Sequence, residues 1–127
     1  MKKKYTVITA IILIPIILIA GFKGFMFYNK YNKENAKKSI YDYIARQGIN
    51  ENQLKYADFY KDYKEGGYIL AVYVEGEKPD IFYEYSYRDG EVFFDAYDGG
   101  AEAIKQKIWG GRGLEGELTK LKYPPLK

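Results

Sequence analysis

An uncharged stretch near the N-terminus constrains this chain more than any other feature. Its eighteen residues, YTVITAIILIPIILIAGF, lie between Lys4 and Lys23. At 1.5 Å per residue a helix of this length measures roughly 27 Å, close to the thickness of about 30 Å of a bilayer's hydrocarbon core. We therefore predict a transmembrane anchor over residues 1–28, completed by Gly24–Tyr28. The residues expected to form its contact with membrane lipid are Ile8, Ile11, Ile12, Leu13, Ile14, Ile16, Ile17, Leu18 and Ile19.

Other interpretations of the same stretch fit less well. A cleaved signal peptide also begins with basic residues, but its apolar core is normally about 7 to 15 residues long and ends in a small-x-small site. Here Ile19 places a bulky side chain in that site. A domain this small cannot cover a helix that is apolar on every face, and an interfacial helix would need a polar face. An uncleaved anchor is favoured, with cleavage as the alternative.

The lysines around the stretch give conflicting signals about orientation. Three precede it and five follow, Lys23, Lys30, Lys33, Lys37 and Lys38, a bias that favours a cytoplasmic C-terminal domain. A short lysine-rich tail before the first apolar segment instead resembles a signal anchor, and long C-terminal domains translocate largely regardless of charge. We expect a single-pass protein of the cell membrane with its domain outside the cytoplasm.

The composition of the remainder excludes several functional classes. The chain has no His and no Cys, so the commonest general base, the commonest metal ligand and disulfides are all absent. From Asn29 onward 16 Lys and Arg stand against 17 Asp and Glu, so the domain lacks the basic patch that nucleic-acid binding requires. Fifteen Tyr and seven Phe indicate a core rich in rings whose polar tips need partners.

Residues 29–98 read as one α+β domain. Apolar residues at helical spacing predict an amphipathic helix over Asn35–Gln47, with Gly48 just past its end. Four runs rich in aromatic and β-branched residues follow, and the short turns between them, including Asp89-Gly90, require antiparallel neighbours. We predict a helix packed on a four-stranded antiparallel meander, a two-layer arrangement like that of cystatin-type and PepSY-type domains. The runs are Leu54–Tyr63, Tyr68–Glu75, Ile81–Arg88 and Glu91–Tyr97.

The apolar pattern also predicts which strand is most deeply buried. Tyr68–Val74 is apolar on both faces, which indicates a central strand or a sheet covered on both sides. Residues 99–127 are expected to form an irregular extension that packs on the domain or trails from it, with a short helix over Ala101–Trp109. Gly111–Gly116 matches the dinucleotide pattern G-x-G-x-x-G, but no parallel βαβ context surrounds it, so a flexible glycine-rich loop is expected.

Carboxylates offer the remaining route to catalysis, and their spacing is unfavourable. Asp58 and Asp62 would lie roughly 13 Å apart along a strand, too far for a dyad. Asp95 and Asp98 beside the Gly99-Gly100 turn suggest a calcium-like site, yet the dense ligand spacing of calcium loops is missing. We therefore expect no enzyme activity, no catalytic residue, no metal site and no cofactor.

The abundant tyrosines could form a recognition surface or simply fill the core of the domain, and the second interpretation is the more common one. Rigid amphipathic rings supply contact area at low entropic cost, although the same rings also suit the core of a small β domain. The candidate partner surface consists of Tyr56, Tyr60, Tyr63, Tyr83 and Tyr85.

Several segments together resemble a known family. They are the lysine-rich apolar start, AKKSIYDYIARQGI, FYKDYKEGGYILAVY, IFYEYSYRDGEVFF and the closing KYPPLK. The chain is similar over nearly its whole length to short membrane-anchored proteins of low-GC Gram-positive bacteria, known as domain of unknown function 3139. The resemblance implies the anchored architecture and supplies no catalytic residues.

The expected function is therefore that of a non-enzymatic, membrane-anchored module. It would bind a protein or peptide partner at the cell surface, and its oligomeric state is open. The alternative is an inhibitor or immunity protein acting on a secreted peptidase or toxin, because domains of similar arrangement bind or restrain peptidases in other proteins.

Overall fold

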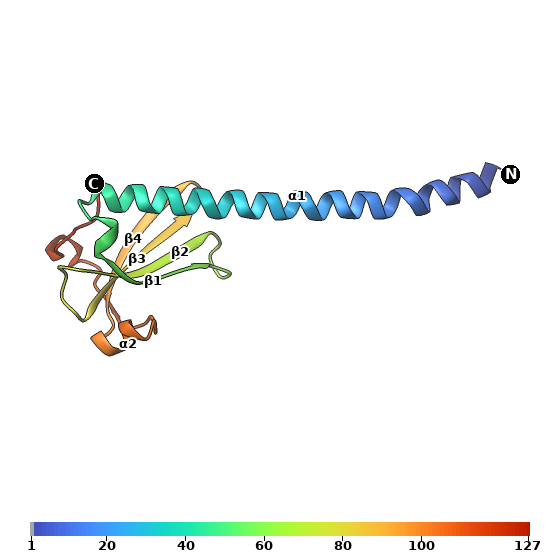
Figure 1. Cartoon of the computed structure of the whole chain (residues 1–127). Helices are drawn as coiled ribbons and strands as arrows, with labels where there is room; N and C mark the ends of the chain where they lie inside the picture. The colour runs from blue at the N-terminus through green and yellow to red at the C-terminus, as the bar shows by residue number, and fades with distance from the viewer. Residues whose placement is uncertain (1) are drawn as a thin grey trace. The chain divides into compact units, whose positions relative to one another are not determined.

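The computed structural model describes residues 2–127, which form two compact units, one ending at Glu34 and the other spanning Asn35–Lys127 (Figure 1). One helix, α1 (Lys2–Arg46), contributes to both. The two helices expected from the sequence are thus one element, because no Gly or Pro lies between Tyr28 and Asn35 to end it.

The N-terminal part of α1 is long and apolar enough to cross a membrane. Its best 18-residue window has a mean hydropathy of 2.5, and none of that window is buried. Length and composition of this kind belong to membrane anchors and to signal sequences alike. Pro15 lies inside the helix without ending it.

The second unit holds a five-stranded antiparallel sheet in the order β1-β2-β3-β4-β5. Its strands are β1 (Leu54–Lys61), β2 (Tyr68–Val74), β3 (Ile81–Arg88), β4 (Glu91–Asp98) and β5 (Arg112–Gly113). Short helical segments lie around it: η1 (Glu51–Gln53), α2 (Ala101–Lys105) and η2 (Leu118–Lys120). The α+β class and the meander are confirmed.

The prediction of four strands missed β5, which lies in the stretch expected to be a flexible loop. Gly111 has φ +136°, and a Cβ there would stand 2.1 Å from the carbonyl oxygen of Asp98. Glycine therefore allows the chain to approach β4 and pair Arg112 with Asp98. The glycines serve a close backbone approach within an antiparallel pair, which is a different use from that in a dinucleotide motif.

The β3–β4 hairpin turn and the end of α1 have the backbone geometry that the sequence predicts. Asp89 and Gly90 both have positive φ, 52° and 78°, which a two-residue type I′ hairpin requires. At the end of α1, Gly48 has φ +87° and its N–H bonds the carbonyl of Ala45, while Ile49 N–H bonds that of Ile44. This is the left-handed helix ending that the position of Gly48 predicts.

The core lies between the last part of α1 and one face of the sheet, here called the helix side. Its buried side chains include Ile40, Ile44, Leu70, Tyr83 and Tyr85. Full burial of an apolar side chain stabilises a fold by roughly 1.5–3 kcal/mol. On the opposite face, Ala71 and Phe82 pack with Ile104 of α2 and with Trp109. Strand β2 is an interior strand that is fully buried on the helix side, and on the opposite face Ala71 is buried while Ile69 and Tyr73 are partly exposed.

The C-terminal segment packs on the domain and, together with Glu77 and Gln47, supplies hydrogen-bond partners for the tyrosine hydroxyls of the core. Tyr83 donates to the carboxylate of Glu77 and accepts from the Tyr123 N–H at 3.2 Å. Tyr85 donates to Oε1 of Gln47 at 2.6 Å, and the Leu126 N–H donates to the hydroxyl of Tyr43 at 2.9 Å. Burial is the largest cause that raises the pKa of both Tyr83 and Tyr85 far above the usual value.

Candidate functional site

The face of the sheet opposite the helix side is covered by α2 and Trp109 only in part. The rest, here called the open face, forms a depression of about 450 Å³. Antiparallel register brings residues from four strands onto it, because alternate residues of paired strands share a face. The open face consists of Tyr60, Ile69, Glu84, Ser86, Phe93, Asp95 and Tyr97.

Negative charge dominates this depression. Its lining includes the guanidinium of Arg88 and five carboxylates, those of Asp62, Glu65, Glu84, Asp95 and Glu115. Glu84 and Asp95 are directly opposite one another on β3 and β4. Like charges in such a cross-strand pair repel. Burial, then Asp95, then Asp62 raise the pKa of Glu84 above its usual 4.5. The carboxylate of Asp95 has partial compensation from the Ala96 N–H at 2.9 Å and the Tyr97 hydroxyl at 3.3 Å.

Two phenols stand beside these carboxylates and remain neutral at physiological pH. Burial raises the pKa of Tyr97 to about 12, with further contributions from Glu84 and Asp95. Burial and the negative charges of Glu84 and Asp58 also raise the pKa of Tyr60. Tyr60 and Tyr97 therefore retain their hydroxyl protons and can donate hydrogen bonds.

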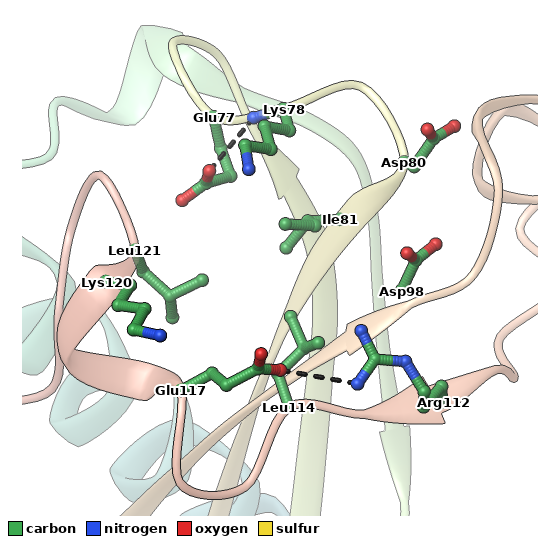
Figure 2. A pocket seen from close by; sticks show the side chains of 10 residues that line it. All are labelled: Glu77, Lys78, Asp80, Ile81, Asp98, Arg112, Leu114, Glu117, Lys120 and Leu121. Atoms are coloured by element: carbon green, nitrogen blue, oxygen red, sulfur yellow. Dashed lines mark hydrogen bonds and ion pairs between the residues drawn. The ribbon is translucent and has the colours of Figure 1, made fainter.

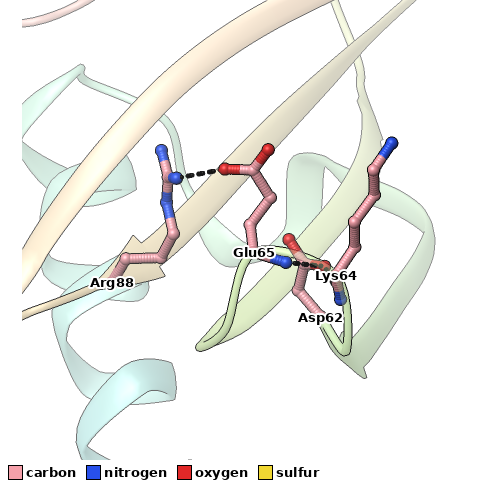
Figure 3. A network of polar contacts seen from close by, with 4 residues as sticks. All are labelled: Asp62, Lys64, Glu65 and Arg88. Atoms are coloured by element: carbon pink, nitrogen blue, oxygen red, sulfur yellow. Dashed lines mark hydrogen bonds and ion pairs between the residues drawn. The ribbon is translucent and has the colours of Figure 1, made fainter.

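One corner of the depression is built by the β1–β2 turn (Figure 3). The Asp62 carboxylate accepts from the backbone N–H groups of Lys64 and Glu65 at 3.0 and 3.1 Å, which fixes the turn. Glu65 pairs with Arg88 at 2.6 Å, and the Arg88 guanidinium lies 4.7 Å from the ring centre of Phe93. The buried Nε of Arg88 has no hydrogen-bond acceptor among residues 2–127.

The five tyrosines predicted as a partner surface do not lie together. Tyr60, 37% exposed, is on the open face; Tyr63, 89% exposed, is in the β1–β2 turn. Tyr56, with φ +58°, lies at a bulge of β1 where the register with β2 shifts. Tyr83 and Tyr85 are fully buried on the helix side, so their assignment to a surface is wrong. Both rings fill the core because β3 is an interior strand beneath α1.

The acidic residues considered for chemistry have separate surroundings. Asp58 accepts a hydrogen bond from Nε1 of Trp109 at 2.8 Å, and Asp62 fixes its turn. Asp95 lines the open face, whereas Asp98 lines a different pocket. Within residues 2–127 no group of three or more acidic side chains surrounds a common point suited to a metal ion.

Sequence reasoning did not select Glu84, Phe93 and Tyr97 as site residues, and it considered Asp95 only together with Asp98, as a calcium-like site that it rejected. The signal was present in the alternation of β3 and β4, where every second residue after Phe82 and Phe93 points to one face. Choosing between the two faces needed the position of the helix, which the strand pattern alone does not give.

Comparison with known proteins places the chain in a family. Residues 2–87 match the family described as "Protein of unknown function (DUF3139)". The chain belongs to this family. It is also 70% identical over 93 residues to an "Uncharacterized 13.4 kDa protein" of Bacillus thuringiensis, covering 72% of this chain and 82% of that protein. No solved structure matches it. The uncharacterised family expected from the sequence is thereby confirmed.

Proposed function

We propose that this DUF3139 protein is a non-enzymatic, single-pass membrane protein whose domain lies outside the cytoplasm and binds a basic protein or peptide segment through its open face. The observation that carries the proposal is the opposed pair Glu84 and Asp95 within a depression that holds five carboxylates and one guanidinium. A cationic partner would remove repulsion that the free domain retains.

The surroundings of the acidic pair favour a peptide over a simple ion. The carboxylates are spread along the face, so they suit several side chains spaced along an extended segment. The rings of Tyr60, Phe93 and Tyr97 offer contact to the aliphatic stems and cationic heads of Lys and Arg.

The anchor part of the proposal is supported by exposed apolar side chains throughout the first half of α1, from Val7 to Met26. In water such a surface would be strongly unfavourable, and hydrocarbon is the environment in which it is stable. Protease added to intact protoplasts is expected to remove the domain and leave a short anchored fragment. A protected domain would contradict the orientation, and full-length protein recovered without detergent would contradict the anchor.

Binding is tested with full-length protein in nanodiscs of neutral lipid. Two fluorescent octapeptides serve as probes, one alternating Lys with Ala and one alternating Glu with Ala. The basic peptide is expected to bind at low salt and more weakly as salt rises, while the acidic peptide does not bind. The double variant Glu84→Gln, Asp95→Asn should weaken binding at least about tenfold, as expected for lost charge-assisted contacts.

The matched control is the double variant Asp89→Asn, Glu91→Gln, which removes the same two charges from the exposed β3–β4 hairpin. It should leave binding within about twofold of the unmodified chain. Equal binding of the acidic peptide, or equal losses in the two double variants, would contradict a role for the open face.

A further inference from the structure

A second pocket, of about 200 Å³, lies away from the open face, between the β2–β3 loop, the end of β4 and the segment that follows β5 (Figure 2). Its floor is apolar, formed by Ile81, Leu114 and Leu121, of which Leu114 and Leu121 are buried. Its rim is charged. An apolar floor with a few polar groups around it is the usual construction of small-molecule sites.

Some of the rim charges are already satisfied by the protein. Arg112 pairs with Glu117 at 3.3 Å. The buried Glu77 carboxylate accepts from the Tyr83 hydroxyl, from the Lys122 N–H at 2.8 Å and from the Lys78 N–H at 3.0 Å. These contacts hold the wall in place and leave little capacity for a ligand.

The other rim charges have no counter-ion in the part of the chain that the structure describes. Neither Lys78 nor Lys120 forms an ion pair there, and the same holds for Asp80 and Asp98. Asp80 accepts the Ala101 N–H at 3.1 Å through one oxygen, while no hydrogen bond to the side chain of Asp98 is observed among these residues. The two lysines lie on one side of the pocket and the two aspartates on the other (Figure 2).

We propose that this pocket binds a small zwitterion of amino-acid or dipeptide size. Its carboxylate would lie against Lys78 and Lys120, its ammonium group against Asp98, and its aliphatic part on Ile81 and Leu114. A ligand with a single charge would leave one side of the rim unmatched, and a drug-sized ligand needs a pocket of about 300 Å³ or more. The proposal is independent of the open face, because the two sites share no lining residue.

The geometry of the walls supports a preformed site. Lys78 follows the buried Glu77, and Lys120 precedes the buried Leu121. Asp98 pairs with Arg112 in the β4–β5 ladder, which depends on the close approach at Gly111. The lysine side and the aspartate side of the pocket are thus attached to backbone that the core holds in place, and this lowers the entropic cost of binding.

The probes are L-alanyl-L-alanine, its N-acetylated form, its C-terminal amide and free L-alanine. Each is titrated into full-length, isotopically labelled protein in neutral-lipid nanodiscs, and amide shifts are followed by NMR. The dipeptide is expected to shift the amides of Ile81, Leu114 and Leu121. Loss of either charge should weaken binding at least about tenfold. Binding of free alanine as tightly as the dipeptide would assign the site to amino acids, and weaker binding would assign it to dipeptides; both support a zwitterion site.

Variants test which residues bind each charged group of the dipeptide. In Lys78→Gln, Lys120→Gln the dipeptide should bind at least about tenfold more weakly and no more tightly than its amide, because the group that reads the carboxylate is gone. In Asp98→Asn the preference over the N-acetylated form should disappear instead. Lys64→Gln and Asp89→Asn, exposed charges elsewhere in the domain, are the matched controls and should keep both preferences.

The unmodified chain alone suffices to overturn the proposal, whatever happens to the folding of a variant. Absence of shifts at the three floor amides, or equal binding of both blocked dipeptides and the parent, would exclude a zwitterion site here. Retention of the carboxylate preference in the folded double lysine variant would do so as well.

Discussion

On the helix side of the sheet, Tyr83 and Tyr85 are completely buried and their hydroxyls have partners within the domain, whereas on the open face Tyr60 and Tyr97 stand beside carboxylates that repel one another. The two faces come from the same strands and the same alternating pattern. The two faces differ in the polar partners of their tyrosines. On the helix side the partners are Glu77, Gln47 and the C-terminal segment. On the open face the Tyr97 hydroxyl donates to Asp95 at 3.3 Å, and Asp95 is itself one of the two opposed carboxylates. A closed face stabilises the fold, while an open face is available for binding.

The largest effect is expected when a tyrosine ring is removed from each face in turn. Tyr85→Ala should lower the free energy of unfolding by about 3–5 kcal/mol, because it leaves a large cavity and removes the hydroxyl that donates to Oε1 of Gln47. Tyr60→Ala on the open face should cost about 1 kcal/mol. Urea unfolding of the full chain in detergent, followed by tyrosine fluorescence, measures both. Similar losses from the two variants would mean that the faces do not differ in the way described.

A smaller effect is expected when the Tyr83 ring is kept and its hydrogen-bond partner Glu77 is changed. In Glu77→Gln the amide cannot accept from Tyr83 and from the backbone of Lys122 and Lys78 with equal strength. A loss of about 2–3 kcal/mol is expected, since these are buried hydrogen bonds to a charged group. Earlier proteolysis of the C-terminal segment should accompany it. The exposed Glu75→Gln is the matched control, and an equal effect there would show that Glu77 does not hold the segment.

Sequence reasoning succeeded where a local rule decides the structure. Asp89-Gly90 predicted its hairpin, and Gly48 predicted the end of the helix. It failed where a distant contact decides. Arg112–Gly113 is too short to show a strand pattern, and only its approach to β4 makes it one. The burial of Tyr83 and Tyr85 depends on which face meets α1, and the pocket of Lys78, Asp98 and Lys120 unites segments far apart in the chain. The family match ends at residue 87, before β4 and β5.

The smallest expected effect is that of Glu84→Gln on the free energy of unfolding. Its sign distinguishes the two faces, because this change should stabilise the domain at pH 7 whereas the changes on the helix side destabilise it. Because the folded state raises the pKa of Glu84 above 4.5, its contribution to stability is fully present below the unfolded pKa and is lost as pH rises through the folded pKa. At pH 7 the ionised carboxylate therefore destabilises the domain. Glu84→Gln should raise the free energy of unfolding by about 0.5–1 kcal/mol at pH 7 and have no effect near pH 4, where Glu84 is protonated.

Thermal unfolding at several pH values measures this difference, with the exposed Glu91→Gln on the neighbouring strand as control, expected to change stability by less than about 0.5 kcal/mol. A carboxylate retained at a cost to stability points to a use outside the fold, since a neutral amide of the same shape would fold better. If Glu84→Gln instead destabilised the domain at pH 7, the carboxylate would be making favourable contacts inside the molecule. The polar groups of the open face would then have partners within the domain, as those of the helix side do, and a cationic partner would relieve no repulsion there.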